Sequence, residues 1–326
     1  DWKKKYVFID MKEDLKDKNI LILCGGWSDE REISLISGKS VYDALLDDGY
    51  TVTHMDLKSN DKTKLTDYIK SKQIDLVFNL IHGLGGEDGL IQSYLDDCDV
   101  KYVGSNAVSS NLSFNKTATK DKWMNLNLPT PSYSNLSGMS KEYLREIQNN
   151  DKIIVKPKSS GSSVGIQILK KEHMNLSSVK NLLESINQNY DNLILDDYFI
   201  EEFIDGNEYT APVIDDKVLP IVKIDTSREF YNYQAKYEDD DTVFSFPTFN
   251  IELENKIKTV CLDAFKGLDC QGWGRVDFFL TEDQNIQLIE LNSIPGMTNH
   301  SLVPMSAKKL GWSYLELIET ILLTEK

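Results

Sequence analysis

Short apolar runs alternate with longer amphipathic segments in the first third of the chain. The runs Asn19 to Cys24, Thr51 to Asp56 and Asp75 to Leu80 are typical of buried strands. Between the first two, Asp29 to Leu46 has helical spacing, with Ser28 as its expected N-cap. A strand, a helix and a second strand in this order predict a βαβ unit with a parallel sheet.

The rest of the chain carries strand-like runs separated by polar turns. Lys152 to Leu169 predicts a hairpin with a Ser- and Gly-rich tip, and Asn192 to Phe203 and Glu208 to Val213 predict further strands. Helical periodicity returns in Leu253 to Leu268 and Leu310 to Leu323. The pattern predicts an α/β chain with a parallel-sheet part first and an α+β part after it.

A second hairpin brings two acids together. The apolar runs Arg275 to Leu280 and Ile286 to Asn292 flank a turn-forming segment. If that turn is centred between Asp283 and Gln284, Asp277 lies opposite Glu290 and Arg275 lies opposite Asn292. Residues two apart on a strand share a face, so all four side chains are expected on one side of the hairpin.

The paired acids point to a cation. Two carboxylates about 5 Å apart repel by roughly 3 kcal/mol at an effective dielectric near 20. Two carboxylates and one amide, from Asp277, Glu290 and Asn292, suit a hard ion such as Mg²⁺ that also binds water and phosphates. Arg275 would then lie where an anion develops. The alternative is a surface hairpin whose acids face solvent.

Glycine-rich segments follow two of the predicted strands. The sequence HGLGGEDG starting at His82 lets a ligand approach the backbone where open α/β sheets place their sites. In the tip of the Lys152 to Leu169 hairpin, backbone N–H groups can cradle phosphates, with Lys156 supplying charge. The alternatives are a structural histidine and a mobile surface loop. From local sequence alone, Glu30 is better explained as a partner of the helix dipole.

Composition narrows the classes of function. The 326 residues carry a formal net charge of −16, which argues against binding nucleic acid or an anionic membrane through a broad basic surface. Apolar runs stay shorter than a bilayer span, and the first residues lack a secretion signal, so a cytoplasmic protein is expected. The four cysteines form no CxxC pair and are expected to be reduced.

Four motifs occur in order: HGLGGEDG, KPKSSGSSVG, GWGRVD and IELNSIPGMTNHSLVP. With them the chain, from about Lys18 to Leu323, resembles the D-alanine–D-alanine ligase family of the ATP-grasp superfamily. The resemblance implies a Rossmann-like substrate domain over residues 1–105. Two ATP-grasp subdomains would follow over 106–205 and 206–326, with ATP held between their sheets.

The resemblance also implies a reaction and its residues. ATP phosphorylates one D-alanine, and a second D-alanine attacks the acyl phosphate, with two Mg²⁺ or Mn²⁺ ions on Asp277, Glu290 and Asn292. The implied catalytic residues are Glu30, Ser162, Tyr237, Arg275, Gly296 and Ser301. The implied substrate residues are His82, Lys236 and Leu302, and Lys236 next to Tyr237 goes with D-alanine rather than D-lactate as acceptor. The implied ATP-binding residues are Lys116, Lys156, Ser163, Glu201, Glu202 and Glu208.

The resemblance further implies peptidoglycan synthesis and a homodimer. Two alternatives stay open at this point. One is a ligase that uses D-serine, D-lactate or another acceptor. The other, from a different class, is a nucleotide- or amino-acid-binding module that keeps the fold without turnover. The lysines of the predicted helix, Lys116, Lys120 and Lys122, are also explained as no more than a solvated face.

Overall fold

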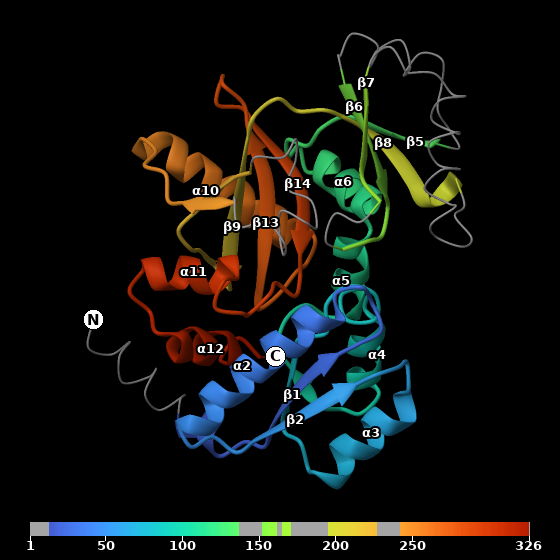
Figure 1. Cartoon of the computed structure of the whole chain (residues 1–326), viewed down its shortest axis with the longest axis vertical. Helices are drawn as coiled ribbons and strands as arrows, with labels where there is room; N and C mark the ends of the chain where they lie inside the picture. The colour runs from blue at the N-terminus through green and yellow to red at the C-terminus, as the bar shows by residue number, and fades with distance from the viewer. Residues whose placement is uncertain (1–12, 137–151, 162–164, 171–194, 227–241, 326) are drawn as a thin grey trace.

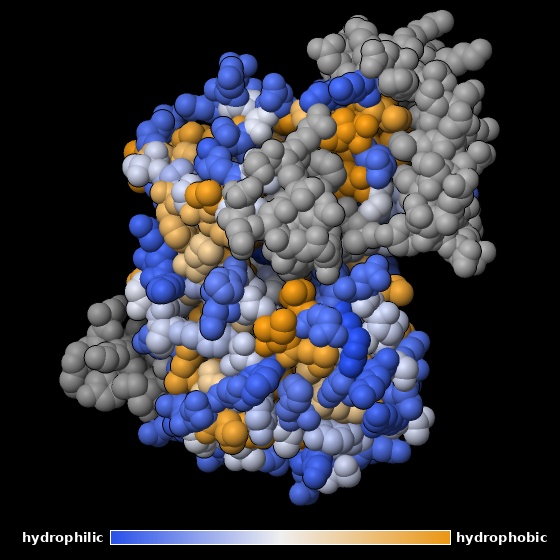
Figure 2. Space-filling model, in the orientation of Figure 1, coloured by the Kyte–Doolittle hydropathy of each residue, from blue (hydrophilic) through white to orange (hydrophobic). Residues whose placement is uncertain are grey.

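The computed structural model describes residues 13–136, 152–161, 165–170, 195–226 and 242–325. In these ranges it contains three sheets, one parallel and two antiparallel, with helices packed against them (Figure 1). Within the described residues no helix is both long and apolar enough to cross a bilayer. On the face shown in Figure 2, polar residues cover much of the described surface and apolar residues show as separate patches.

The first sheet is parallel, in the order β2-β1-β3-β4. Its strands are β1 (Ile20–Gly25), β2 (Val52–Leu57), β3 (Leu76–Asn79) and β4 (Lys101–Tyr102), and the helices between them are α2 (Arg31–Asp47), α3 (Lys62–Ser71) and α4 (Leu90–Asp96). The predicted βαβ unit is confirmed. The carboxyl ends of β1 and β3 lead into the loops that hold Glu30 and His82.

The expected N-cap of α2 was wrong. Glu30, not Ser28, precedes the first helical residue. The Ser28 hydroxyl instead donates to the His82 carbonyl at 2.7 Å and accepts from the Glu30 N–H at 3.3 Å. The serine therefore links two loops at the end of the sheet, a contact that depends on tertiary packing rather than on local helix chemistry.

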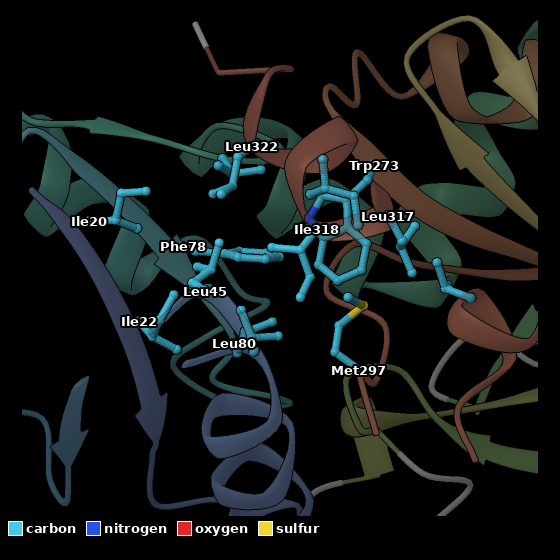
Figure 3. Packing of buried hydrophobic residues seen from close by; sticks show 14 of the residues in the cluster. Ile20, Ile22, Leu45, Phe78, Leu80, Trp273, Met297, Leu317, Ile318 and Leu322 are labelled. Atoms are coloured by element: carbon cyan, nitrogen blue, oxygen red, sulfur yellow. The ribbon is translucent and has the colours of Figure 1, made fainter. Parts of the chain in front are cut away.

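Alternate residues of strand β1 face two different cores. Ile20 and Ile22 pack with α2 and with α12 (Tyr314–Leu322) near the end of the chain (Figure 3). Leu21 and Leu23 pack on the other face, against α3 and α4. A strand buried on both faces explains the continuous apolar run in its sequence.

The second sheet is antiparallel, in the order β5-β8-β6-β7. Its strands are β5 (Tyr133–Asn135), β6 (Lys152–Pro157), β7 (Gln167–Lys170) and β8 (Tyr198–Glu202). The predicted hairpin of β6 and β7 is confirmed. Helices α5 (Ala107–Phe114) and α6 (Lys116–Asn125) come before it in the chain, and the 3-10 turn η3 (Leu195–Asp197) leads into β8.

The third sheet is antiparallel and has the order β12-β11-β9-β13-β14, with β10 paired to β9. Its strands are β9 (Asn207–Ile214), β10 (Lys217–Val218), β11 (Val222–Asp225), β12 (Val243–Ser245), β13 (Trp273–Leu280) and β14 (Ile286–Asn292). Helix α10 (Ile251–Gly267) packs against this sheet together with Trp123 of α6. The fold is thus mixed α/β, as predicted.

The last predicted helix has a different extent. The segment from Leu310 to Leu323 is not one helix, because α11 (Leu302–Lys309) ends at Lys309, with Leu310 as its C-cap, and α12 begins only at Tyr314. Gly311 between them has a φ of 87°, which breaks the helix, and Ser313 starts the next one with a capping box. Trp273 of β13 and Met297 extend into the same core as α12 (Figure 3).

Candidate active site

The hairpin of β13 and β14 brings the predicted residues together. Asp277 pairs with Glu290 and Arg275 pairs with Asn292, as the sequence predicts. The turn itself is placed differently, since Leu280 pairs with Ile286 and the register shifts between Asp277 and Phe278. A β-bulge at this shift restores the predicted pairing at the acids. Bulges of this kind re-aim side chains next to active sites.

The carboxylate of Asp277 collects four hydrogen bonds. Arg275 donates from Nε to Oδ1 and from Nη2 to Oδ2, each at 2.9 Å. Thr210 of the neighbouring strand β9 donates to Oδ1 at 2.5 Å, and Asn292 Nδ2 donates to Oδ2 at 2.9 Å. With Asp277 only 5% exposed, these bonds offset the cost of burying its charge. The alternative of a solvent-facing hairpin is therefore wrong.

The negative charge of Glu290 is balanced by a lysine. Lys116, the first residue of α6, places its ammonium 3.2 Å from Glu290 Oε2 and donates to the Ser160 carbonyl at 2.7 Å. Its backbone N–H also donates to the Lys158 carbonyl at 2.8 Å. Lys116 thus connects the tip of the β6–β7 hairpin to the acidic face of β14.

The oxygen donors of this face fit a hard divalent ion. Asp277, Glu290 and Asn292 lie on one face, and the amide of Asn292 turns its Nδ2 to Asp277, which leaves its oxygen as a possible ligand. No three His, Cys, Asp or Glu residues of the described ranges form a complete cage. Two acids and one amide suit Mg²⁺, which takes its remaining ligands from water and phosphates.

A buried charge cluster lies between β6, β8 and α6. Lys156 and Lys120 both form ion pairs with Glu201, one with each carboxylate oxygen. Burial alone would raise the pKa of Glu201, but the two ammonium groups hold it below its usual range. The sequence predicted Lys156 and Glu201 but missed Lys120. A solvated face does not describe Lys116 or Lys120, which are 8% and 0% exposed.

Glu202 and Glu208 are placed apart from this cluster. Glu202 follows Glu201 on β8 and accepts from the Ser132 hydroxyl at 3.0 Å on the other face of the strand. Glu208 is near the start of β9, where it pairs with Ile224 on one side and Phe279 on the other. Lys116 contacts the hairpin face directly through Glu290, whereas the side chain of Glu202 points away from the Glu201 cluster.

Glu30 lies where the first and second sheets meet. A Cβ atom added to Gly83 would lie 2.6 Å from its Oε2, and one added to Gly161 would lie 1.9 Å from the same atom. A side chain at either position would displace this carboxylate from its place, and Gly83 also has a φ of 68° that favours glycine. The glycine-rich segments found in the sequence thus surround Glu30, which makes a role limited to the helix dipole insufficient.

His82 is 3% exposed and held by two neighbours. Its Nδ1 lies 2.9 Å from the Ile294 carbonyl oxygen, and its Nε2 lies 3.5 Å from the Ser37 hydroxyl. Burial lowers the pKa of His82, although nearby Glu30 acts against this. The ring is therefore neutral at pH 7 and fixes the loop after β14 to the first sheet.

Glu87, which lies in the same glycine-rich loop, was not among the residues predicted for the site. Its Oε1 accepts from the Gly83 N–H at 2.9 Å. Burial, followed by the charge of Glu30, raises the pKa of Glu87 to about 8. An acid inside a glycine-rich loop at a strand end was the signal that could have identified it.

Gly296 and Ser301 lie next to each other in the loop before α11. A Cβ added to Gly296 would lie 2.8 Å from the Ser301 hydroxyl oxygen. That oxygen accepts from the Thr298 N–H at 3.0 Å and lies 2.9 Å from the Thr298 hydroxyl. The side chain of Leu302, the first residue of α11, packs with Val222 and Ile224 in a small core. Ser162, Ser163, Lys236 and Tyr237 lie outside the described residues.

Comparison with known proteins gives the family. The chain matches the family described as D-ala D-ala ligase C-terminus over residues 123–323 and the one described as D-ala D-ala ligase N-terminus over residues 58–105. It is 38% identical over 318 residues to a D-alanine--D-alanine ligase of Glaesserella parasuis, covering 94% of this chain and 98% of that relative.

Solved structures agree with this match. A D-alanine--D-Alanine ligase from Bacillus anthracis superposes with a TM-score of 0.78 at 30% identity, covering 94% of this chain and 96% of that one. The same enzyme complexed with ATP gives a TM-score of 0.77 at 27% identity, with 94% and 97% covered. On these matches, which span nearly its whole length, the chain belongs to the D-alanine–D-alanine ligase family.

Proposed function

We propose that this chain joins two D-alanine molecules into D-alanyl-D-alanine at the expense of ATP, for peptidoglycan synthesis. Family membership supports the reaction. The observation that carries it is the face of β13 and β14, where Arg275, Asp277, Glu290 and Asn292 converge with Lys116. Two acids held beside two cations form a site suited to phosphate transfer.

ATP would bind between the second and third sheets. Lys156 and Glu201 lie on strands of the second sheet, and Lys116 touches both the Ser160 carbonyl and Glu290 of the third. The phosphates would lie near Lys116 and the β6–β7 tip, with the remainder of the nucleotide toward Glu201. Ser163 and Glu208 are further proposed nucleotide contacts, and Glu202, whose side chain lies on the other face of β8, would contribute through its backbone.

Asp277, Glu290 and Asn292 would hold Mg²⁺ or Mn²⁺, and two ions are expected. When bound, such ions neutralise charge on the phosphates during transfer. Arg275 supplies fixed positive charge beside this position, and the Gly296 N–H is the second donor proposed for the oxyanion. Both groups belong to structured segments, so little reorganisation is needed when charge develops.

Glu30 would bind the ammonium group of the first D-alanine. Its carboxylate lies at the junction of the loops of Gly83 and Gly161, with neutral His82 nearby. Ser301, at the start of α11, would bind the carboxylate of the second D-alanine together with the Leu302 N–H. Ser162, Tyr237 and Lys236 are proposed to close over the substrates, which excludes water from the acyl phosphate.

The proposal includes the cytoplasm as the place of the reaction and a homodimer as the assembly. All four cysteines are free thiols in the structure, which agrees with a reducing compartment. The three-part organisation over 1–105, 106–205 and 206–326 belongs to the same proposal. The support for these ranges is that each of them contains all the strands of one sheet.

The test is phosphate release from Mg-ATP with product identification by mass. D-alanine should give D-alanyl-D-alanine, whereas L-alanine should give no dipeptide. D-serine and D-lactate, each added with D-alanine, decide between acceptors. If the product that joins D-alanine to D-serine or D-lactate exceeds D-alanyl-D-alanine, that molecule and not D-alanine is the preferred acceptor. ATP binding without turnover on any of these substrates would instead favour a binding module.

A further inference from the structure

Lys120 is buried in a way that the proposed reaction does not yet explain. It lies on α6 with 0% exposure, and its ammonium forms an ion pair with Glu201 Oε1, while Lys156 forms one with Oε2. One carboxylate therefore lies between two ammonium groups. Burial lowers the pKa of Lys120 to about 8, so it is mainly charged at pH 7.

A second contact joins Lys120 to the third sheet. Its ammonium donates to the Thr130 hydroxyl at 2.6 Å, and that hydroxyl donates to the Leu288 carbonyl at 2.8 Å. The Leu288 N–H returns a bond to the Pro129 carbonyl at 2.9 Å. Leu288 is two residues before Glu290 on β14. Lys120 thus connects the Glu201 cluster to the strand that carries the proposed metal ligands.

The charge of Lys120 determines whether the cluster of Lys120, Lys156 and Glu201 is positive or neutral. With one carboxylate shared by two ammonium groups, the cluster keeps one net positive charge. Without Lys120, Lys156 and Glu201 would form a neutral pair, and Lys156 would attract an anionic ligand less strongly. A buried ammonium is costly, and an apolar side chain would fill a purely structural position at lower cost.

We propose that Lys120 is a positioning residue for the nucleotide, which shares the charge of Glu201 so that Lys156 stays available to it. Through Thr130 it also fixes the distance between the second sheet and strand β14. The inference rests on the proposed function, because it assumes that ATP binds between these sheets. Lys120 is assigned no contact with the substrates.

The first test measures ADP binding by calorimetry and steady-state kinetics for Lys120→Met, with Lys122→Met on the same helix as the matched control. Lys120→Met should weaken ADP binding and raise KM for ATP by about tenfold or more, with KM for D-alanine changed less than about twofold. Lys122→Met should leave both unchanged. Equal ADP affinity in wild type and folded Lys120→Met would overturn the inference.

A double-mutant cycle separates positioning from general stability. Once Glu201 is replaced by Gln, the further change Lys120→Met should alter ADP affinity by less than about threefold, because the two residues act as a unit. Independent effects that multiply would contradict the inference. If Lys120→Met does not fold, Lys120→Gln takes its place and should weaken ADP binding, because it also removes the charge. Lys120→Arg keeps the charge and should weaken ADP binding less. Unchanged affinity in Lys120→Gln would count against the proposal.

ADP binding does not require the ligase reaction. A wild-type protein that binds ADP and makes no dipeptide would therefore refute the proposed function and still allow the role of Lys120 to be tested. Conversely, dipeptide formation with unaltered ADP affinity in the variants would leave the function in place and remove only the role of Lys120.

Discussion

Arg275 and Asp277, two residues apart on β13, form a two-point ion pair in which Nε and Nη2 of the guanidinium each lie 2.9 Å from a different carboxylate oxygen. The planar guanidinium suits this geometry, whereas a lysine ammonium would make a single contact. The pair also fixes the direction of Arg275 relative to Glu290 on the opposite strand.

Replacement of Arg275 by Lys keeps the positive charge and removes the two-point contact with Asp277. We expect kcat to fall by about 100-fold, because a donor aimed at developing charge is lost, while ATP binding changes little. Stopped-time dipeptide assays and ADP calorimetry measure the two effects. Lys223→Met, on β11 of the same sheet, is the control for general changes in charge. A kcat within about twofold of wild type would rule out the role given to Arg275.

Replacement of Glu290 by Gln keeps the size of the side chain and removes a proposed metal ligand. We expect turnover to fall by at least about 100-fold and Mn²⁺ binding in the presence of ADP to weaken, since a carboxylate is the stronger ligand for a hard ion. Electron paramagnetic resonance of bound Mn²⁺ gives a readout separate from activity. Glu282→Gln, in the exposed turn of the same hairpin, should behave like wild type. Unchanged Mn²⁺ affinity in Glu290→Gln would remove this residue from the site.

Glu87 should give the stability of the protein a specific dependence on pH. Its pKa is raised from 4.5 to about 8 in the folded state. Between these values the folded protein binds more protons than the unfolded chain, so the free energy of unfolding falls as the pH rises. Glu87→Gln removes this titration while keeping an acceptor for the Gly83 N–H.

Urea denaturation of both proteins at pH 5 and pH 8 tests this expectation. The loss of stability from pH 5 to pH 8 should be smaller in Glu87→Gln by about 2 kcal/mol, after allowance for partial exposure of the carboxyl. Asp88→Asn, in the same loop, is the control. Parallel pH profiles for wild type and Glu87→Gln would show that Glu87 titrates normally.

Tyr50 joins the first sheet to the end of the chain through its hydroxyl, which donates to Glu319 Oε1 at 2.7 Å in a buried position. Tyr50→Phe removes this bond and leaves a buried carboxylate with one donor fewer. We expect a loss of about 1 to 3 kcal/mol in the free energy of unfolding, with kcat unchanged. Tyr94→Phe, whose hydroxyl bonds to Asn60 in an exposed position, should lose less than about 0.5 kcal/mol. Equal losses in the two variants would contradict the expectation.

The pairing of residues in the hairpin of β13 and β14 could be predicted from local sequence. The alternation of side chains and the turn residues predicted which residues face each other, because both signals depend on neighbours along the chain. The turn was nevertheless misplaced by half a residue, and the pairing of Asp277 with Glu290 came out as predicted because a bulge compensates. A bulge leaves no clear sign in the apolar pattern.

The burial of Lys120 could not be predicted from local sequence. Three lysines in seven residues of one helix are typical of a solvated face, yet Lys120 is wholly buried and Lys116 nearly so. Their partners, Glu201 and Glu290, come from strands far along the chain. Helical spacing tells which residues share a face, but it does not tell what covers that face.

By itself the sequence determined the order of strands and helices, the chemistry of the paired acids and, through its motifs, the family. These depend on local periodicity, turn composition and residue types, which are present in the chain before it folds. Only the tertiary structure decided that Gly83 and Gly161 both close on Glu30 and that Glu201 lies between Lys156 and Lys120. The physical reason is that burial and ion pairing depend on distance in space, which packing between the three sheets sets.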